Sequence, residues 1–233
     1  MDAPDFDATP SPAEFARLID HTLLRPDATF GEIDQLCDEA LEYGFFSVCV
    51  NAMHVERCSE RLAQSATVIC SVVGFPLSGC GTDAKLAETG FALASGAREL
   101  DMVIPVGALK SGDEALVLSD VGAIAARCHE SDALLKVILE TCLLTEPEKR
   151  LAGELAIRAG ADFLKTSTGF SSGGATVADV RLLREAAGPV PGVKAAGGIG
   201  TVPFALELVR AGASRLGCSR SVQLMQSLAS AQG

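Results

Sequence analysis

A lysine inside an apolar segment is the residue of this chain best suited to chemistry. Lys165 ends the run 161–165 (ADFLK), which predicts a buried strand, and the polar residues 166–171 (TSTGFS) follow it. Taking an ammonium group out of water is costly or drives off its proton. A lysine amine without that proton is a nucleophile for carbonyl carbon. The segment therefore predicts Schiff-base chemistry at Lys165.

Two further charged residues lie in neighbouring apolar runs. Lys194 lies in 192–198 (GVKAAGG), and Asp101 lies in 99–104 (ELDMVI). A second ammonium group disfavours protonation of the first, so we expect Lys194 to lower the pKa of Lys165. Asp101 is placed to move protons as a carbinolamine forms and breaks down. The plainer interpretation is that Lys194 binds an anion and Asp101 is a structural counter-ion.

Other side chains are expected to support these three. Asp20 and Lys136 lie in apolar strands and are interpreted as interior charge partners, with Glu140 on the same strand face as Lys136. Cys49 lacks a histidine placed to activate it, so we expect it to form part of the pocket wall together with Thr168. These residues are predicted to line or underlie the pocket and not to carry the primary chemistry.

A second kind of site is suggested by glycines that follow the late strands. Barrels often bind phosphate with backbone N–H groups from the loops after strands seven and eight. A hydroxyl and a guanidinium follow the last of these glycines. The predicted phosphate site comprises Gly169, Gly197, Gly198, Gly217, Ser219 and Arg220.

Composition excludes several classes of function. The formal net charge of −11 argues against non-specific binding to nucleic acid or to acidic membranes. The longest uncharged stretch, 62–82, is interrupted by Ser, Thr, Gly and Pro and is interpreted as a strand with its loops. The N-terminus has no signal-peptide pattern. Eight cysteines without a CxxC pair suggest reduced thiols and a cytoplasmic protein.

Metal and nucleotide motifs are also missing from the sequence. The three histidines, His21, His54 and His129, do not have metal-ligand spacing, and there is neither a P-loop nor a GxSxG elbow. No metal or cofactor is therefore expected.

Apolar runs recur along the chain at the spacing of strand–helix units. Helical patterns fill the gaps, and one of them places Ile33, Leu36, Cys37, Ala40 and Leu41 on a single face. A doubly wound sheet would call for a dinucleotide loop after the first strand, where the chain instead reads 25–29 (RPDAT). We predict an α/β fold, a single (β/α)8 TIM barrel over 15–233, after a flexible or capping segment 1–14. The eight strand centres are expected near Ile19, Val48, Ile69, Met102, Val137, Leu164, Val193 and Leu216.

Four glycines predict which residues of the even-numbered strands lie at the same height in the barrel, and we call this alignment the glycine register. Gly44, Gly96, Gly160 and Gly212 each end a predicted helix, as glycine often does. Five residues further on stand Cys49, Asp101, Lys165 and Gly217, on strands two, four, six and eight. Interior layers of a barrel take four side chains from alternate strands. We therefore expect these four residues to share one inward-facing layer.

The chain resembles the deoxyribose-phosphate aldolase family from about residue 15 to residue 224. The resemblance rests on phrases in a fixed order, namely 19–24 (IDHTLL), 71–76 (SVVGFP), 99–104 (ELDMVI), 107–112 (GALKSG), 136–141 (KVILET), 161–170 (ADFLKTSTGF) and 193–198 (VKAAGG). It implies a metal-free class I aldolase that reversibly cleaves 2-deoxy-D-ribose 5-phosphate to D-glyceraldehyde 3-phosphate and acetaldehyde. It also implies a place in deoxyribose phosphate catabolism, sugar phosphate and aldehydes as ligands, and a homodimer.

By this resemblance Lys165 is the Schiff-base lysine, Lys194 the second active-site lysine, which exchanges protons with the substrate, and Asp101 the proton-transferring aspartate. Cys49 matches a pocket cysteine, and the glycines with Ser219 match positions around the phosphate. The chain departs from the family pattern at Pro105, where asparagine is frequent, and at Gly200, where arginine is common. Arg220 stands where a small residue is usual, and we interpret it as restoring the charge lost at Gly200.

Two alternatives remain open at this point. One is a barrel that binds a phosphorylated ligand without catalysis, which would need neither Lys165 nor Asp101 in its interior. The other is a class I aldolase with a different donor.

Overall fold

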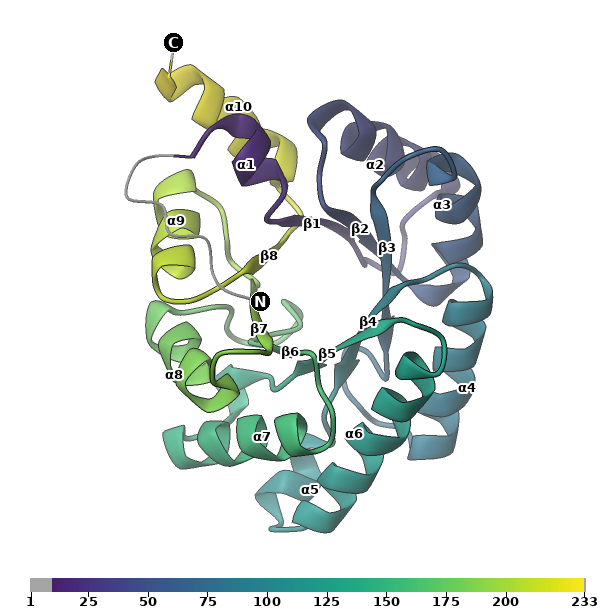
Figure 1. Cartoon of the computed structure of the whole chain (residues 1–233), viewed down its shortest axis with the longest axis vertical. Helices are drawn as coiled ribbons and strands as arrows, with labels where there is room; N and C mark the ends of the chain where they lie inside the picture. The colour runs from purple at the N-terminus through teal and green to yellow at the C-terminus, as the bar shows by residue number, and fades with distance from the viewer. Residues whose placement is uncertain (1–9, 233) are drawn as a thin grey trace.

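Eight parallel strands close into a barrel in the computed structural model, which describes residues 10–232. Every strand pairs with its neighbour in sequence, and the last pairs with the first. The helices form a ring around the strands (Figure 1). The predicted (β/α)8 barrel is confirmed, and each predicted strand centre lies in a strand. The strands are β1 (Ile19–Leu23), β2 (Ser47–Val50), β3 (Val68–Val73), β4 (Glu99–Val103), β5 (Leu134–Ile138), β6 (Phe163–Lys165), β7 (Gly192–Ala196) and β8 (Arg215–Cys218).

Helices begin and end where local chemistry permits. Thr29 and Glu32 form a capping box at the start of the helix α2, and Gly44 ends it with φ of 69°. The helices are α1 (Pro12–Ala16), α2 (Phe30–Tyr43), α3 (Val55–Leu62), α4 (Thr82–Ala94), α5 (Val106–Lys110), α6 (Glu114–His129), α7 (Glu146–Arg158), α8 (Val177–Ala187), α9 (Val202–Arg210) and α10 (Ser221–Gln232), with short 3₁₀ turns at Ala52–His54 and Thr141–Leu143. No helix within residues 10–232 is long and apolar enough to cross a membrane.

One predicted apolar helix face is partly wrong. Ile33, Leu36, Cys37 and Ala40 are buried against the barrel, but Leu41 is 47% exposed. A residue eight positions along a helix has rotated by about 80° from the first, so it can lie at the edge of the buried stripe.

The predicted N-terminal segment lies mostly outside the described residues, which begin at residue 10. Its end contributes to α1, whose Phe15 and Ala16 are buried. The helix α1 packs against α10 (Figure 1). The division at residue 14 stays a prediction.

The barrel interior is built from three layers of four side chains. Each even strand contributes two inward-facing residues that lie two positions apart. The inward-facing residue of each odd strand pairs with its neighbours at a height between these two. The upper layer, nearest the carboxyl ends of the strands, consists of Cys49, Asp101, Lys165 and Gly217. The middle layer consists of Asp20, Cys70, Lys136 and Lys194, and the lower layer consists of Ser47, Glu99, Phe163 and Arg215.

The apolar core lies outside the barrel, between the strands and the helices. Leu100 and Met102 alternate with Glu99 and Asp101 along β4, and all four are buried. Burial of each large apolar side chain contributes roughly 1.5–3 kcal/mol. This outer core holds the strands in place, and the interior is thereby free to carry charge.

Candidate active site

Asp101 lies at the centre of a buried cluster of charges. Its Oδ2 atom accepts hydrogen bonds from Lys165 Nζ at 2.7 Å and from Lys194 Nζ at 2.8 Å. Its Oδ1 atom accepts one from Lys136 Nζ at 2.9 Å. The glycine register is confirmed, because all four register glycines have positive φ and the fifth residue after each lies in the upper layer. The structure thus brings together Lys165, Lys194 and Asp101, which come from three different strands.

Electrostatics keep Asp101 and Lys194 ionised. Burial alone would raise the pKa of Asp101, but the three ammonium groups hold it well below its ordinary value. Burial would lower the pKa of Lys194, but the Asp101 and Asp20 carboxylates raise it. Lys194 therefore retains its proton at neutral pH. The predicted effect of Lys194 on the pKa of Lys165 stays a prediction.

The middle and lower layers form the floor beneath Asp101. Asp20 contacts Lys194 Nζ at 2.5 Å and Arg215 at 2.8 Å, and it accepts a hydrogen bond from Ser47. Lys136 bridges to Glu99 at 2.6 Å and to Asp101. These contacts fit the interpretation of Asp20 and Lys136 as interior charge partners.

The expectation for Glu140 is wrong. This residue lies beyond the end of β5 with φ of 55°, so it does not share a strand face with Lys136. Its carboxylate accepts a hydrogen bond from the Thr168 hydroxyl at 2.5 Å and from the Thr168 backbone N–H at 3.2 Å. Glu140 therefore holds the loop after β6 that carries Thr168 and Gly169.

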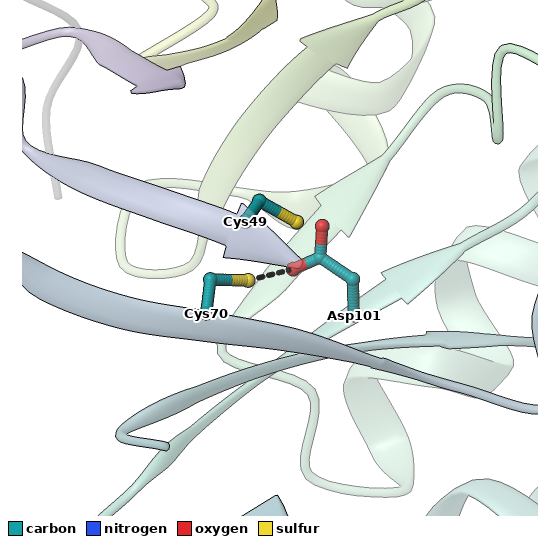
Figure 2. Close-up of side chains that lie close together, drawn as sticks. All are labelled: Cys49, Cys70 and Asp101. Atoms are coloured by element: carbon teal, nitrogen blue, oxygen red, sulfur yellow. Dashed lines mark hydrogen bonds between the residues drawn. The ribbon is translucent and has the colours of Figure 1, made fainter. Parts of the chain in front are cut away.

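Two cysteines face Asp101 from neighbouring strands (Figure 2). Cys70 Sγ donates a hydrogen bond to Asp101 Oδ1 at 3.2 Å, and Cys49 lies in register beside Cys70. The hydrogen bond with Cys70 lowers the pKa of the Cys49 thiol in spite of its burial. The two sulfurs and an Asp101 oxygen are close enough to share an ion. A cation there would be repelled by the three ammonium groups on Asp101, so the residues do not fit a metal site.

A cavity of about 330 Å³ opens above the upper layer at the carboxyl ends of the strands. Lys165 lines it and connects it to the charged interior. Six residues predicted for the pocket or the phosphate site line it as well: Thr168, Gly169, Gly197, Gly198, Gly217 and Ser219. The structure therefore places the predicted nucleophile and most of the predicted phosphate site around one space.

Two glycines of the cavity wall lie in close packing. A Cβ on Gly197, whose φ is 86°, would lie 3.0 Å from the Gly174 Cα atom and 3.3 Å from the Gly169 Cα atom. A Cβ on Gly217 would lie 3.1 Å from Lys194 Cε. Gly217 thus leaves room for Lys194, as the register suggested.

Arg220 does not line the cavity. It is exposed, and its guanidinium lies beside Gly200, 3.8 Å from where a Cβ of residue 200 would stand. This location agrees with the interpretation that Arg220 supplies charge where the family commonly has arginine at the position of Gly200.

Several residues around the site escaped the sequence reasoning. Glu99 and Arg215 belong to the lower layer, and each lies two positions before a residue predicted for the interior. Side chains two positions apart in a strand point to the same face, so this period could have revealed both. Arg25 lines the cavity at the end of β1 and pairs with Asp27 and Glu32. Cys70 gave no signal, because a cysteine in an apolar strand reads as an ordinary core residue.

A parallel barrel with a buried amine opening onto a glycine-lined cavity is the architecture of a barrel enzyme acting on small molecules. The sequence model of the DeoC/LacD family aldolases matches residues 15–221. The chain belongs to this family.

Individual relatives agree over nearly the whole length. Deoxyribose-phosphate aldolase 1 of Bacillus licheniformis is 52% identical over 215 residues, which cover 92% of this chain and 96% of that one. Deoxyribose-phosphate aldolase of Brevibacillus brevis is 54% identical, covering 90% of this chain and 94% of that one. The tetrameric deoxyribose phosphate aldolase of Aeropyrum pernix superposes with a TM-score of 0.89 at 36% identity, covering 95% of this chain and 93% of that one.

Proposed function

We propose that this enzyme is a class I deoxyribose-phosphate aldolase that reversibly cleaves 2-deoxy-D-ribose 5-phosphate through a Schiff base on Lys165. The observation that carries the proposal is the position of Lys165, which touches both the Asp101 carboxylate and the cavity. The relatives of this name, at about half identity over nine-tenths of the chain, support the choice of substrate.

Charge balance supports Lys165 as the amine that reacts. The buried cluster holds four cationic side chains, Lys136, Lys165, Lys194 and Arg215, against the three carboxylates Asp20, Glu99 and Asp101. One amine can therefore give up its proton and leave the cluster neutral. Among the described residues, Lys165 contacts a single carboxylate, whereas Lys194 contacts two and Lys136 three. Lys165 thus loses the least attraction when it becomes a free amine.

The reaction then follows from the groups present. The free Lys165 amine attacks C1 of the open-chain sugar, and the carbinolamine loses water to give an iminium ion. The iminium draws the electrons of the C2–C3 bond toward nitrogen as the C3 hydroxyl loses its proton, which releases D-glyceraldehyde 3-phosphate and leaves an enamine. Protonation at C2 and hydrolysis release acetaldehyde. Asp101, beside the nucleophile and Lys194, is the proposed carrier of these protons.

The glycine loops are the proposed phosphate-binding site. Gly169, Gly197, Gly198, Gly217 and Ser219 surround the cavity above Lys165, where backbone N–H groups can meet a phosphate. Binding the phosphate there positions C1 of the substrate over the amine, so remote binding energy contributes to the rate.

Trapping with borohydride tests the proposal directly. Reduction in the presence of acetaldehyde is expected to add one ethyl group to Lys165, located by peptide mass mapping. An ethyl group on another lysine, or none, would refute the proposal. Acetone and pyruvate offered in place of acetaldehyde test the choice of donor, and we expect acetaldehyde to be preferred.

We also propose a cytoplasmic location and a homodimeric assembly. The eight free cysteines fit a compartment that keeps thiols reduced. Sedimentation equilibrium of the purified protein tests the assembly, and a monomer at micromolar concentration would contradict it.

A further inference from the structure

His21 lies outside the charged interior, although its neighbours Asp20 and Thr22 face inward along β1. It is 4% exposed and packs against the Phe45 ring, with 4.8 Å between ring centroids. Its Nε2 atom lies 2.8 Å from Glu39 Oε2 on α2, and its Nδ1 atom lies 3.0 Å from the Ser221 hydroxyl. One imidazole therefore connects β1 with two helices.

Ser221 connects this histidine to the wall of the cavity. It is the first residue of α10, is fully buried, and lies within hydrogen-bonding distance of the Cys218 carbonyl, 3.0 Å away. Gly217, Cys218 and Ser219, which precede it, line the cavity. Gly217 and Cys218 are the last residues of β8 and Ser219 follows them, so the contact of Ser221 with Cys218 acts on the end of this strand.

The hydrogen-bonding roles follow from the partners. A carboxylate only accepts, so Nε2 of His21 carries the proton toward Glu39. Burial lowers the pKa of His21 although Glu39 opposes this, so the ring is neutral and Nδ1 accepts. Ser221 has one hydroxyl proton, which it then shares between Nδ1 and the Cys218 carbonyl, each 3.0 Å from its oxygen, in a three-centre hydrogen bond. Gln35 holds Glu39 in turn, donating to its Oε1 atom at 2.7 Å.

We propose that Glu39, His21 and Ser221 form a positioning relay that holds residues 217–219, at the end of β8, in the geometry that binds the substrate phosphate. The relay touches no reacting atom and acts through the backbone of these three residues. The inference rests on the proposed function, because it assigns the phosphate to this end of β8.

Two substitutions of His21 separate its two hydrogen bonds. The amide of asparagine overlays Nδ1 and can still reach Ser221, whereas the amide of glutamine overlays Nε2 and reaches only Glu39. His21→Gln is expected to raise KM for 2-deoxyribose 5-phosphate about tenfold through displacement of residues 217–219, and His21→Asn much less. In both variants kcat, and KM for unphosphorylated 2-deoxyribose, are expected to change by less than about twofold.

Inorganic phosphate provides a second readout as a competitive inhibitor. Its inhibition constant is expected to rise about tenfold in His21→Gln and in Ser221→Ala, in step with KM. His129→Gln is the matched control, because His129 also pairs with a carboxylate, Asp162 at 3.0 Å, but lies at the end of α6 away from the cavity.

The outcomes separate the two proposals. Equal losses for phosphorylated and unphosphorylated substrate, or unchanged KM and inhibition constant in His21→Gln, would overturn the relay. A parent protein that cleaves neither substrate would instead refute the proposed function. If His21→Gln does not fold, the inhibition constant of Ser221→Ala decides, and an unchanged value overturns the relay.

Discussion

The upper and lower layers of the barrel interior contain similar charges with opposite consequences. In the lower layer, Arg215 lies between Asp20 and Glu99, at 2.8 and 3.1 Å, with its guanidinium 3.4 Å from the centre of the Phe46 ring. In the upper layer, Lys165 pairs with Asp101 at 2.7 Å and lines the cavity. Both cations are almost completely buried.

The difference lies in the chemistry of the cation and in its access. A guanidinium does not lose its proton in a protein, so Arg215 can only balance charge. An amine can lose its proton, and Lys165 stands where a carbonyl compound can reach it. The comparison teaches that burial and pairing alone do not identify a nucleophile. An open side toward the cavity and a removable proton are also needed.

Removing the upper-layer amine has the largest expected effect on activity. Lys165→Leu should reduce kcat on the order of 10⁴-fold or more, because no covalent intermediate can form. The rate of aldehyde release from 2-deoxyribose 5-phosphate measures this. Lys110→Leu, which removes an exposed lysine paired with Glu148, should be nearly normal. Turnover in Lys165→Leu close to that of the parent would contradict the assignment.

Neutralising Asp101 should have the second-largest effect on activity. Asp101→Asn keeps the shape of the side chain but loses its proton transfer, so kcat is expected to fall about 10²- to 10⁴-fold. Borohydride trapping should still label Lys165, only more slowly. If kcat were unchanged, Asp101 would be a counter-ion like Glu99, and the contrast between the layers would disappear.

The lower layer should respond mainly in stability. Arg215→Met leaves Asp20 and Glu99 each without one partner, and breaking a buried pair typically costs about 3–5 kcal/mol. Urea denaturation measures the loss. Three lysines then face three carboxylates, which favours the protonated form of every amine, so kcat per folded molecule should also fall, by less than in Asp101→Asn. Arg150→Met, at an exposed pair with Glu146 and Glu185, is the control and should leave the free energy of unfolding nearly unchanged. A fall in kcat as large as that of Asp101→Asn would mean that the two layers act as one.

Acid should weaken the upper and middle layers through their carboxylates. Burial would raise the pKa of Asp20, but Lys194 and Arg215 hold it below its ordinary value, and the pKa of Asp101 is also lowered. The unfolded chain therefore binds more protons than the folded one below about pH 4, and the free energy of unfolding should fall as the pH drops from there. Urea titrations between about pH 6 and pH 3 test this. Asp101→Asn should show a shallower fall, and an equal slope would contradict the assignment.

The smallest effect on activity is expected at the exposed residue Arg220, outside the cavity. Arg220→Ser should raise KM for 2-deoxyribose 5-phosphate about threefold, and less at high salt, because it removes an exposed charge near the phosphate loops. Adding Gly200→Arg to this variant should restore KM, since residue 200 has room for a side chain. Failure of this restoration would show that the two positions are not equivalent.

Much of the barrel and of its central cluster could be predicted from sequence. Glycines that end helices have a local conformational cause, and counting from them placed Cys49, Asp101, Lys165 and Gly217 in one layer. Arg25 and Arg220 could not be placed in the same way, because a loop side chain has no fixed period and its direction depends on its partners.

The sequence by itself determined the fold class, the strand positions and the three central residues, because strand period and helix ends are local properties of the chain, and its ordered motifs carried the resemblance to the family. Only the tertiary structure decided the partners. The contacts of Lys165 and Lys194 with one oxygen of Asp101, the cation pairs of the lower layer, and the link from His21 through Ser221 to the cavity join residues 64 to 200 positions apart. Closure of the barrel creates these contacts, since a residue on one strand meets its interior partners only when all eight strands have paired.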